Sequence, residues 1–208
     1  MADSIVYPGL VHLNGCLMAA VDLETTGTRP GYHEIIQIAV VPLDSDFRPL
    51  ADVRPFYTLV KPEHPERESA GAKHKHKIPM TELLLHAPDS ARVVDWLYEW
   101  FAALKLPFKK CLIPLAHNWA FESSFLKAWL GVEQTDLIFH SHARDGMLYA
   151  ISLNDKAGLR RRAGPVPTGR PGGHVQAAGH HQRQSPRRPG RLPGRGGSLP
   201  RTAADVLR

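Results

Sequence analysis

The hydrophobic pattern of the first 157 residues predicts several short strands. Apolar runs rich in β-branched residues cover 16–24, 34–43 and 55–62. A fourth apolar run covers 111–118. Runs of this length, bounded by turn residues, are typical of buried strands.

Helical spacing follows in other parts of the chain. Segment 90–106 predicts an amphipathic helix, because its large apolar residues recur every three or four positions. Asn118 is a plausible N-cap for a helix that Gly131 ends, and 144–155 predicts one more helix. The polar segment 63–90 mixes loop with short helix. Strands followed by alternating helices and strands indicate an α/β layered domain.

Charge divides the chain into two parts. Residues 1–157 hold 15 Lys and Arg against 19 Asp and Glu, whereas 158–208 holds 11 Arg, no Lys and a single acid, Asp205. The net charge of +6 therefore comes from the tail. The tail also has 10 Gly and 7 Pro, with no Ile, Phe, Tyr, Trp or Met, so we expect it to be disordered.

The remaining composition indicates a soluble protein of the cytoplasm. The two cysteines, Cys16 and Cys111, lie beside apolar runs and suggest reduced, buried thiols. The first 15 residues lack the pattern of a secretory signal, and no apolar run reaches the roughly 20 residues that a membrane helix needs. We expect no membrane partner.

The first candidate site lies where the first strand ends, in "VDLETTG". Asp22 and Glu24 are two residues apart, so on a strand both carboxylates leave the same face. One explanation of such a pair is that the strand simply ends in solvent, where both acids are hydrated. The apolar run leading directly into it favours a second explanation, in which a divalent cation offsets the repulsion between the two acids.

A second stretch, "AHNWAFESSFL", adds a third acid. Glu122 shares a helical stripe with Leu126 and Leu130, so it is predicted to point toward the packed side. An acid near an exposed helix N-terminus is common and needs no ligand. An inward one needs a cation or a hydrogen-bond donor, and three converging carboxylates would suit Mg²⁺ or Mn²⁺.

These two stretches resemble the first and second motifs of the DEDDh exonucleases, the family of the proofreading 3′–5′ exonuclease subunits. The resemblance spans roughly 16–157 and implies a ribonuclease H-like fold, a mixed central sheet in a three-layer domain. It further implies two metal ions, Mg²⁺ or Mn²⁺, and hydrolysis of terminal phosphodiesters at 3′ ends of single-stranded DNA or RNA. By motif position Asp22, Glu24 and Glu122 are the catalytic metal ligands. Glu122 stands where the family has Asp, one methylene shorter.

The family's third motif is a histidine followed five positions later by an aspartate, which act as general base and metal ligand. Only "HSHARD", with His140 and Asp145, has this spacing, and it comes too soon after the second motif. Asp145 is better explained as a helix cap. The exonuclease domain over 1–157 is therefore predicted to be incomplete, lacking its C-terminal helix, and the chain impaired.

Two explanations of the tail stay open. Read one nucleotide later with suitable synonymous codons, part of 158–208 can become a helix containing "HDALAD", the missing motif. This suggests a frameshift between Lys156 and Leu159, which makes the tail an out-of-frame translation. Alternatively, the arginines form a disordered arm that binds nucleic acid. The function alternatives follow: an exonuclease impaired in this frame, or a catalytically silent protein that binds nucleic acid.

Two further features are predicted to be structural. The run "KHKHK" (73–77) is expected to be a solvated loop or helix face, although contact with a substrate phosphate stays open. Trp96, Trp100 and Trp129 lie on apolar stripes and are assigned to the core.

Overall fold

The structure, a computed structural model, describes residues 16–107 and 111–159. Except for its first two residues, the predicted tail over 158–208 lies outside these ranges. The domain division and the frameshift therefore stay predictions. In the described part no helix is both long and apolar enough to cross a membrane.

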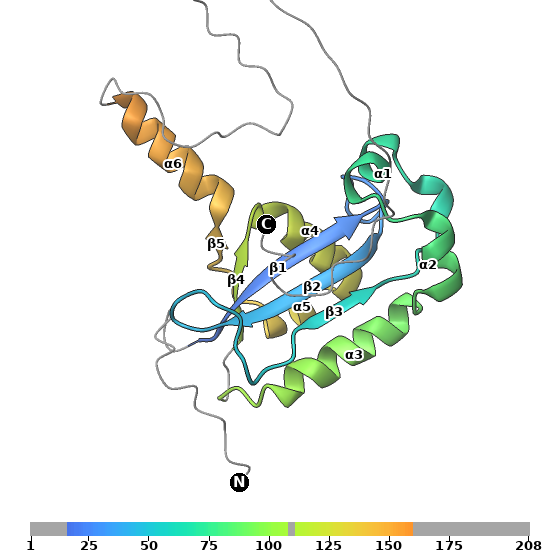
Figure 1. Cartoon of the computed structure of the whole chain (residues 1–208), viewed down its shortest axis with the longest axis horizontal. Helices are drawn as coiled ribbons and strands as arrows, with labels where there is room; N and C mark the ends of the chain where they lie inside the picture. Colours follow the sequence, from blue (N-terminus) through green and yellow to red (C-terminus); the bar gives the residue numbers. More distant parts are fainter. Residues whose placement is uncertain (1–15, 108–110, 160–208) are drawn as a thin grey trace, which may run out of the picture.

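Five strands of the described chain form one mixed sheet, in the order β3-β2-β1-β4-β5 (Figure 1). They are β1 (Met18–Thr25), β2 (Ile35–Leu43), β3 (Phe56–Leu59), β4 (Ile113–Ala116) and β5 (Arg144–Asp145). β2 pairs antiparallel with β1 and β3, whereas β4 pairs parallel with β1 and β5. The four predicted strands and the α/β class are confirmed. The carboxyl ends of β1, β4 and β5 meet at one edge.

The helices come from the segments between and after these strands. They are α1 (Ala70–His76), α2 (Met80–His86), α3 (Ser90–Ala103), α4 (Trp119–Leu130), α5 (Val132–Ile138) and α6 (Gly146–Leu159), with a 3₁₀ turn at Pro65–Arg67. The predicted helix over 90–106 is confirmed as α3, and the predicted end at Gly131 is confirmed by its positive φ of 91°.

The main core lies between one face of the sheet and the helices α3, α4 and α5. Alternate residues of β1 enter it, and so do Val93 and Leu97 of α3 and Leu126 of α4, all fully buried. The three tryptophans assigned to the core pack against this cluster. Met18 and Ala20 point to the opposite face, in a smaller cluster. Because side chains alternate, this second face continues into Asp22 and Glu24.

The sequence pattern missed α5 and β5. α5 begins directly after Gly131, where the expected helix stops, and β5 has only two residues, which are paired with Leu115 and Ala116. α6 begins at Gly146 rather than at 144, and Figure 1 shows it projecting away from the sheet. None of its residues is buried, and Leu148 and Tyr149 are exposed.

Candidate active site

Asp22 and Glu24 lie at the end of β1 and leave the same face of the sheet, as the alternation predicts. Asp22 is exposed and Glu24 half-buried. Although solvent reaches Asp22, partial burial of its carboxyl group by neighbouring residues raises the pKa of that group. The charge of His117 acts in the opposite direction and lowers this pKa. Burial, followed by the nearby charge of Asp22, raises the pKa of Glu24 to about 7, while Lys75 acts in the opposite direction.

Glu122 lies in the first turn of α4 and is 6% exposed. The predicted inward orientation is therefore confirmed, and the alternative of an exposed acid at a helix N-terminus is wrong. Burial and the charges of Asp22 and Asp145 raise its pKa to about 7, against a backbone hydrogen bond that lowers it. Its Oε2 atom is buried and has no hydrogen-bond partner among the residues that the structure describes. A buried carboxylate oxygen in this state needs a proton or a cation.

The three acids interact in pairs. Asp22 acts electrostatically on both Glu24 and Glu122, so it lies near each of them. Within residues 16–107 and 111–159, however, no group of three or more His, Cys, Asp or Glu side chains is arranged to hold a metal ion. The carboxylates thus have the chemistry that a hard cation prefers, while their positions do not form a finished ligand cage. Their role as metal ligands stays a prediction.

Asp145 has the structural role that the sequence predicted. One carboxylate oxygen accepts a hydrogen bond from the backbone N–H of Leu148 at 2.9 Å, which caps α6. The other accepts from the N–H of Trp119 at 2.8 Å, at the start of α4. Asn118 is the N-cap residue of α4, as predicted, although its side chain makes no capping hydrogen bond. Asp145 provides the cap from a neighbouring strand.

His140 lies at the wrong end of the sheet to act on these acids. The backbone N–H of His140 donates to the backbone carbonyl of Leu112, just before β4. Asp145 pairs with Ala116 at the other end of that strand. Four residues of a strand span about 13 Å. His140 is therefore separated from the carboxyl edge by the length of β4, which supports the prediction that "HSHARD" is not the third motif.

Two basic neighbours of the acids were not predicted as such. His117 follows β4 directly, and its charge favours the ionised form of Asp22. Lys75 of α1 does the same for Glu24. The adjacency of the parallel strands β1 and β4 is the signal that identifies His117, whereas Lys75 depends on how α1 folds back. In the "KHKHK" run, Lys75 is exposed as expected, but the side chain of His76 is fully buried, 3.2 Å from Glu68.

The glycine of "ETTG" allows a close contact that shapes the loop after β1. A Cβ atom at Gly27 would overlap the ring of His33, whose Nδ1 accepts a hydrogen bond from the Arg29 N–H and so fixes the ring. We expect Gly27→Ala to lower the free energy of unfolding by about 1–3 kcal/mol, as overpacking does. Gly71→Ala is the control, because nothing lies within 4 Å of its Cβ and alanine favours the helix. Urea denaturation of both variants measures the difference, and equal effects would contradict the contact.

The raised pKa values predict that the metal-free protein loses stability as the pH rises. In the unfolded chain Glu24 and Glu122 release their protons near the ordinary pKa of 4.5. In the folded chain their pKa values are raised to about 7, so they keep their protons up to about that pH. The free energy of unfolding should therefore fall between these pH values and stay low above them. Allowing for solvent screening, we expect about 1–2 kcal/mol in total.

Glu122→Gln tests this pH dependence, because glutamine has no proton to release. Denaturation in a chelator at several pH values should give a shallower fall for the variant than for the unmodified chain. Parallel curves would show that Glu122 titrates normally.

A family model for exonucleases matches residues 19–122, half of the chain. No curated protein matches the sequence. Solved structures are similar at low identity. Exonuclease I from Methylocaldum szegediense has 17% identity and a TM-score of 0.53, covering 69% of this chain and 31% of that one. E. coli exonuclease I in complex with a dT13 oligonucleotide has 18% identity and a TM-score of 0.50, with the same coverage.

At this identity the solved structures bear on the fold alone. They confirm the ribonuclease H-like arrangement of a mixed sheet with helices. The chain spans only about a third of the length of these solved relatives.

Proposed function

Because this chain belongs to the exonuclease family, we propose that it is built for metal-dependent removal of nucleotides from the 3′ end of single-stranded DNA or RNA. The observation that carries the proposal is the meeting of acids from two separate motifs. Asp22 of β1 acts electrostatically on Glu24 of the same strand and on Glu122 of α4. Such a concentration of acids with raised pKa values is typical of functional sites.

The donor set fits a hard divalent cation, Mg²⁺ or Mn²⁺. All three side chains offer carboxylate oxygens, and the buried Oε2 of Glu122 has no other partner in the described part of the chain. Asp22, Glu24 and Glu122 would hold the ions. Two ions bound together would activate a water molecule and stabilise the departing oxygen. The residues of the chain contribute position and charge, with His117 and Lys75 favouring the ionised forms of Asp22 and Glu24.

The substrate class rests on the solved relatives. E. coli exonuclease I has been solved with a dT13 and with a 5cy-dA13 oligonucleotide, which are single-stranded. We extend this substrate class to the present chain as part of the proposal. A preference for DNA over RNA depends on contacts with the sugar.

We further propose that this chain is impaired. His140 lies at the amino end of β4, and Asp145 uses both carboxylate oxygens as caps, so neither supplies the third motif. Without a general base, the attacking water keeps its proton longer, which costs about 10²–10⁴ in rate. A catalytically silent protein that binds nucleic acid through the incomplete site is the alternative function.

Digestion of single-stranded DNA labelled at its 5′ end tests the proposal. With Mg²⁺ or Mn²⁺ we expect slow shortening to a ladder of labelled products, and with a chelator none, because the metal supplies most of the catalysis. Release of a short labelled fragment at once would indicate the opposite polarity or internal cleavage. Intact DNA at every metal concentration, together with measurable binding, would favour the silent binding protein.

A further inference from the structure

A pocket separate from the three acids opens beside the loop that follows β1. Its volume is about 370 Å³, and its walls come from that loop, from the segment after β3, and from α3 and α4. Asp22, Glu24 and Glu122 are not among its lining residues. Its size lies at the lower end of the range of about 300–1,000 Å³ that is usual for ligand pockets, which suits one small group rather than a long ligand.

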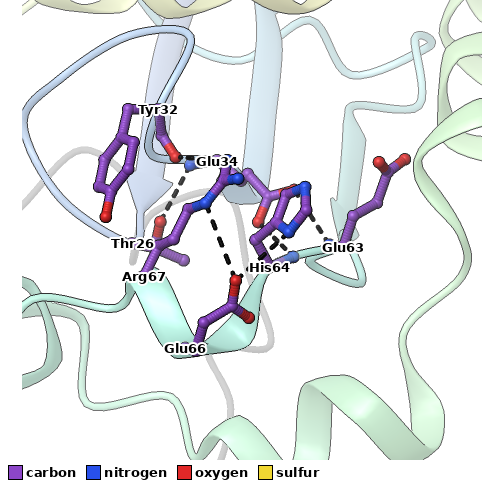
Figure 2. Close-up of polar contacts among 7 residues, drawn as sticks. All are labelled: Thr26, Tyr32, Glu34, Glu63, His64, Glu66 and Arg67. Carbon is purple, nitrogen blue, oxygen red and sulfur yellow. Dashed lines mark hydrogen bonds and ion pairs between the residues drawn. The ribbon is translucent and has the colours of Figure 1, made fainter.

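A polar network fixes two walls of this pocket against each other (Figure 2). The carboxylate of Glu34 accepts hydrogen bonds from the backbone N–H groups of Glu63 and His64, at 3.0 and 2.9 Å. Arg67 donates to the carbonyl oxygen of Tyr32 at 3.4 Å, and its guanidinium lies 5.0 Å from the centre of the Tyr32 ring. These interactions hold the backbone at His64 and the side chain of Arg67 at the pocket before any ligand arrives.

The ion pairs of Lys61 and Arg67 in the pocket are weak. Arg67 lies 3.8 Å from Glu66, and Lys61 lies 3.5 Å from Asp89. Both acids are largely exposed, at 68% and 79%, and surface ion pairs of this kind contribute little free energy. A phosphate group can therefore replace Glu66 and Asp89 as the partner of Arg67 and Lys61 at low cost.

Trp129 gives the pocket an aromatic wall. Its Nε1–H donates to Ser90 Oγ at 2.7 Å, which fixes the orientation of the indole. No ring or cation of the described chain stacks on this indole as Arg29 and Arg67 do on Tyr32. Ile35 and Phe125 close the apolar floor and are buried. A flat face beside two cations is the combination that binds a base and its phosphate.

We propose that this pocket binds one nucleotide of a single-stranded nucleic acid, with its base against Trp129 and its phosphate at Lys61 and Arg67. The identity of the strand rests on the proposed nuclease function, while the residues that bind it are separate from the acids. Phe125 of the pocket and Glu122 belong to successive turns of α4, so one strand can reach both places. The pocket thus adds binding affinity for the substrate at a place away from the scissile bond.

Binding without hydrolysis tests the pocket. Fluorescently labelled oligothymidylate and oligouridylate are titrated in a chelator, at several salt concentrations, with the unmodified chain and with Lys61→Met, Arg67→Met and the double variant. Methionine keeps most of the apolar stem of the side chain and removes the charge. Each loss should weaken binding several-fold, and the double variant should reduce the slope of log K against log salt by about 0.7, the value for one phosphate contact on a single strand.

Two more variants make the result specific. Arg92→Met is the matched control, because Arg92 also lies over an aromatic ring, that of Trp96, but outside the pocket. Ala128→Glu adds a negative charge to the lining from an exposed position of α4 and should weaken binding without touching the core. Circular dichroism checks that each variant is folded.

The outcomes separate the pocket from the nuclease proposal. Weaker binding and a smaller salt slope in the pocket variants, but not in Arg92→Met, support the pocket even if no DNA is ever cut. Unchanged binding, or an equal loss in Arg92→Met, overturns the pocket and leaves the nuclease site untouched. Displacement of the oligonucleotide by an acidic peptide at lower concentration than by unlabelled strand would also overturn it, in favour of a protein partner.

Discussion

A chain whose gene is read one nucleotide later from the region of Lys156 is expected to degrade single-stranded DNA about 10²–10⁴ times faster than the present chain. The physical reason is the return of a general base and of one more metal ligand, which act as a unit with the three acids. Initial rates on the same 5′-labelled substrate, at equal protein and Mn²⁺ concentrations, measure the gain.

The control for this experiment is the restored chain with alanine in place of the histidine of its third motif. It should fall back toward the rate of the present chain while remaining folded. If the nucleotide sequence across codons 150–170 encodes the basic tail without a displaced frame, no restored chain exists and the frameshift hypothesis is wrong. Equal rates for the two chains would instead show that the restored histidine and aspartate do not contribute to catalysis.

Much of the fold was predictable because local pattern and tertiary packing agree. The period of two along β1 placed Asp22 and Glu24 on one face, and the helical stripe of Leu126 and Leu130 placed Glu122 inward. Both inferences need only the repeat of a strand or a helix. They were therefore available before any contact between β1 and α4 was known.

The missed features depend on neighbours that are distant in sequence. β5 has two residues and exists only through its pairing with β4, and α5 follows Gly131 so closely that the glycine marks the end of one helix and the N-cap of the next. The cap of α4 comes from Asp145, which accepts a hydrogen bond from the backbone N–H of Trp119, 26 residues earlier in the sequence. No local pattern contains such a donor and acceptor pair.

The site itself shows the same division. Residue types and spacing indicated the three acids as candidates, but no local pattern contains their environment. Burial and the charge of Asp22 raise the pKa values of Glu24 and Glu122 to about 7. Since metal binding must displace the remaining protons, these raised values predict a site that binds cations better as the pH rises. The arrangement of charges, rather than the sequence motif, thus sets when the site can be loaded.

Asp22→Ala is expected to abolish metal-dependent shortening of single-stranded DNA. Asp22 acts electrostatically on both Glu24 and Glu122, so its loss removes a group that interacts with the acids of both motifs. If the bound metal supplies about 4 kcal/mol of transition-state stabilisation, the rate falls by about 10³-fold. The measurement is made in the restored chain where its rate is high enough, and otherwise at high concentration of the present one.

Asp95→Ala is the matched control for this substitution, because Asp95 is an exposed aspartate of α3 with no ion pair among the described residues. It should digest DNA at the unmodified rate, which shows that losing one negative charge does not by itself alter the reaction. Asp22→Ala should also bind oligothymidylate in a chelator as well as the unmodified chain does, since the proposed nucleotide pocket does not contain Asp22. Undiminished cleavage by Asp22→Ala would mean that the acids at the end of β1 are structural, and the nuclease activity would then have to be assigned to other residues.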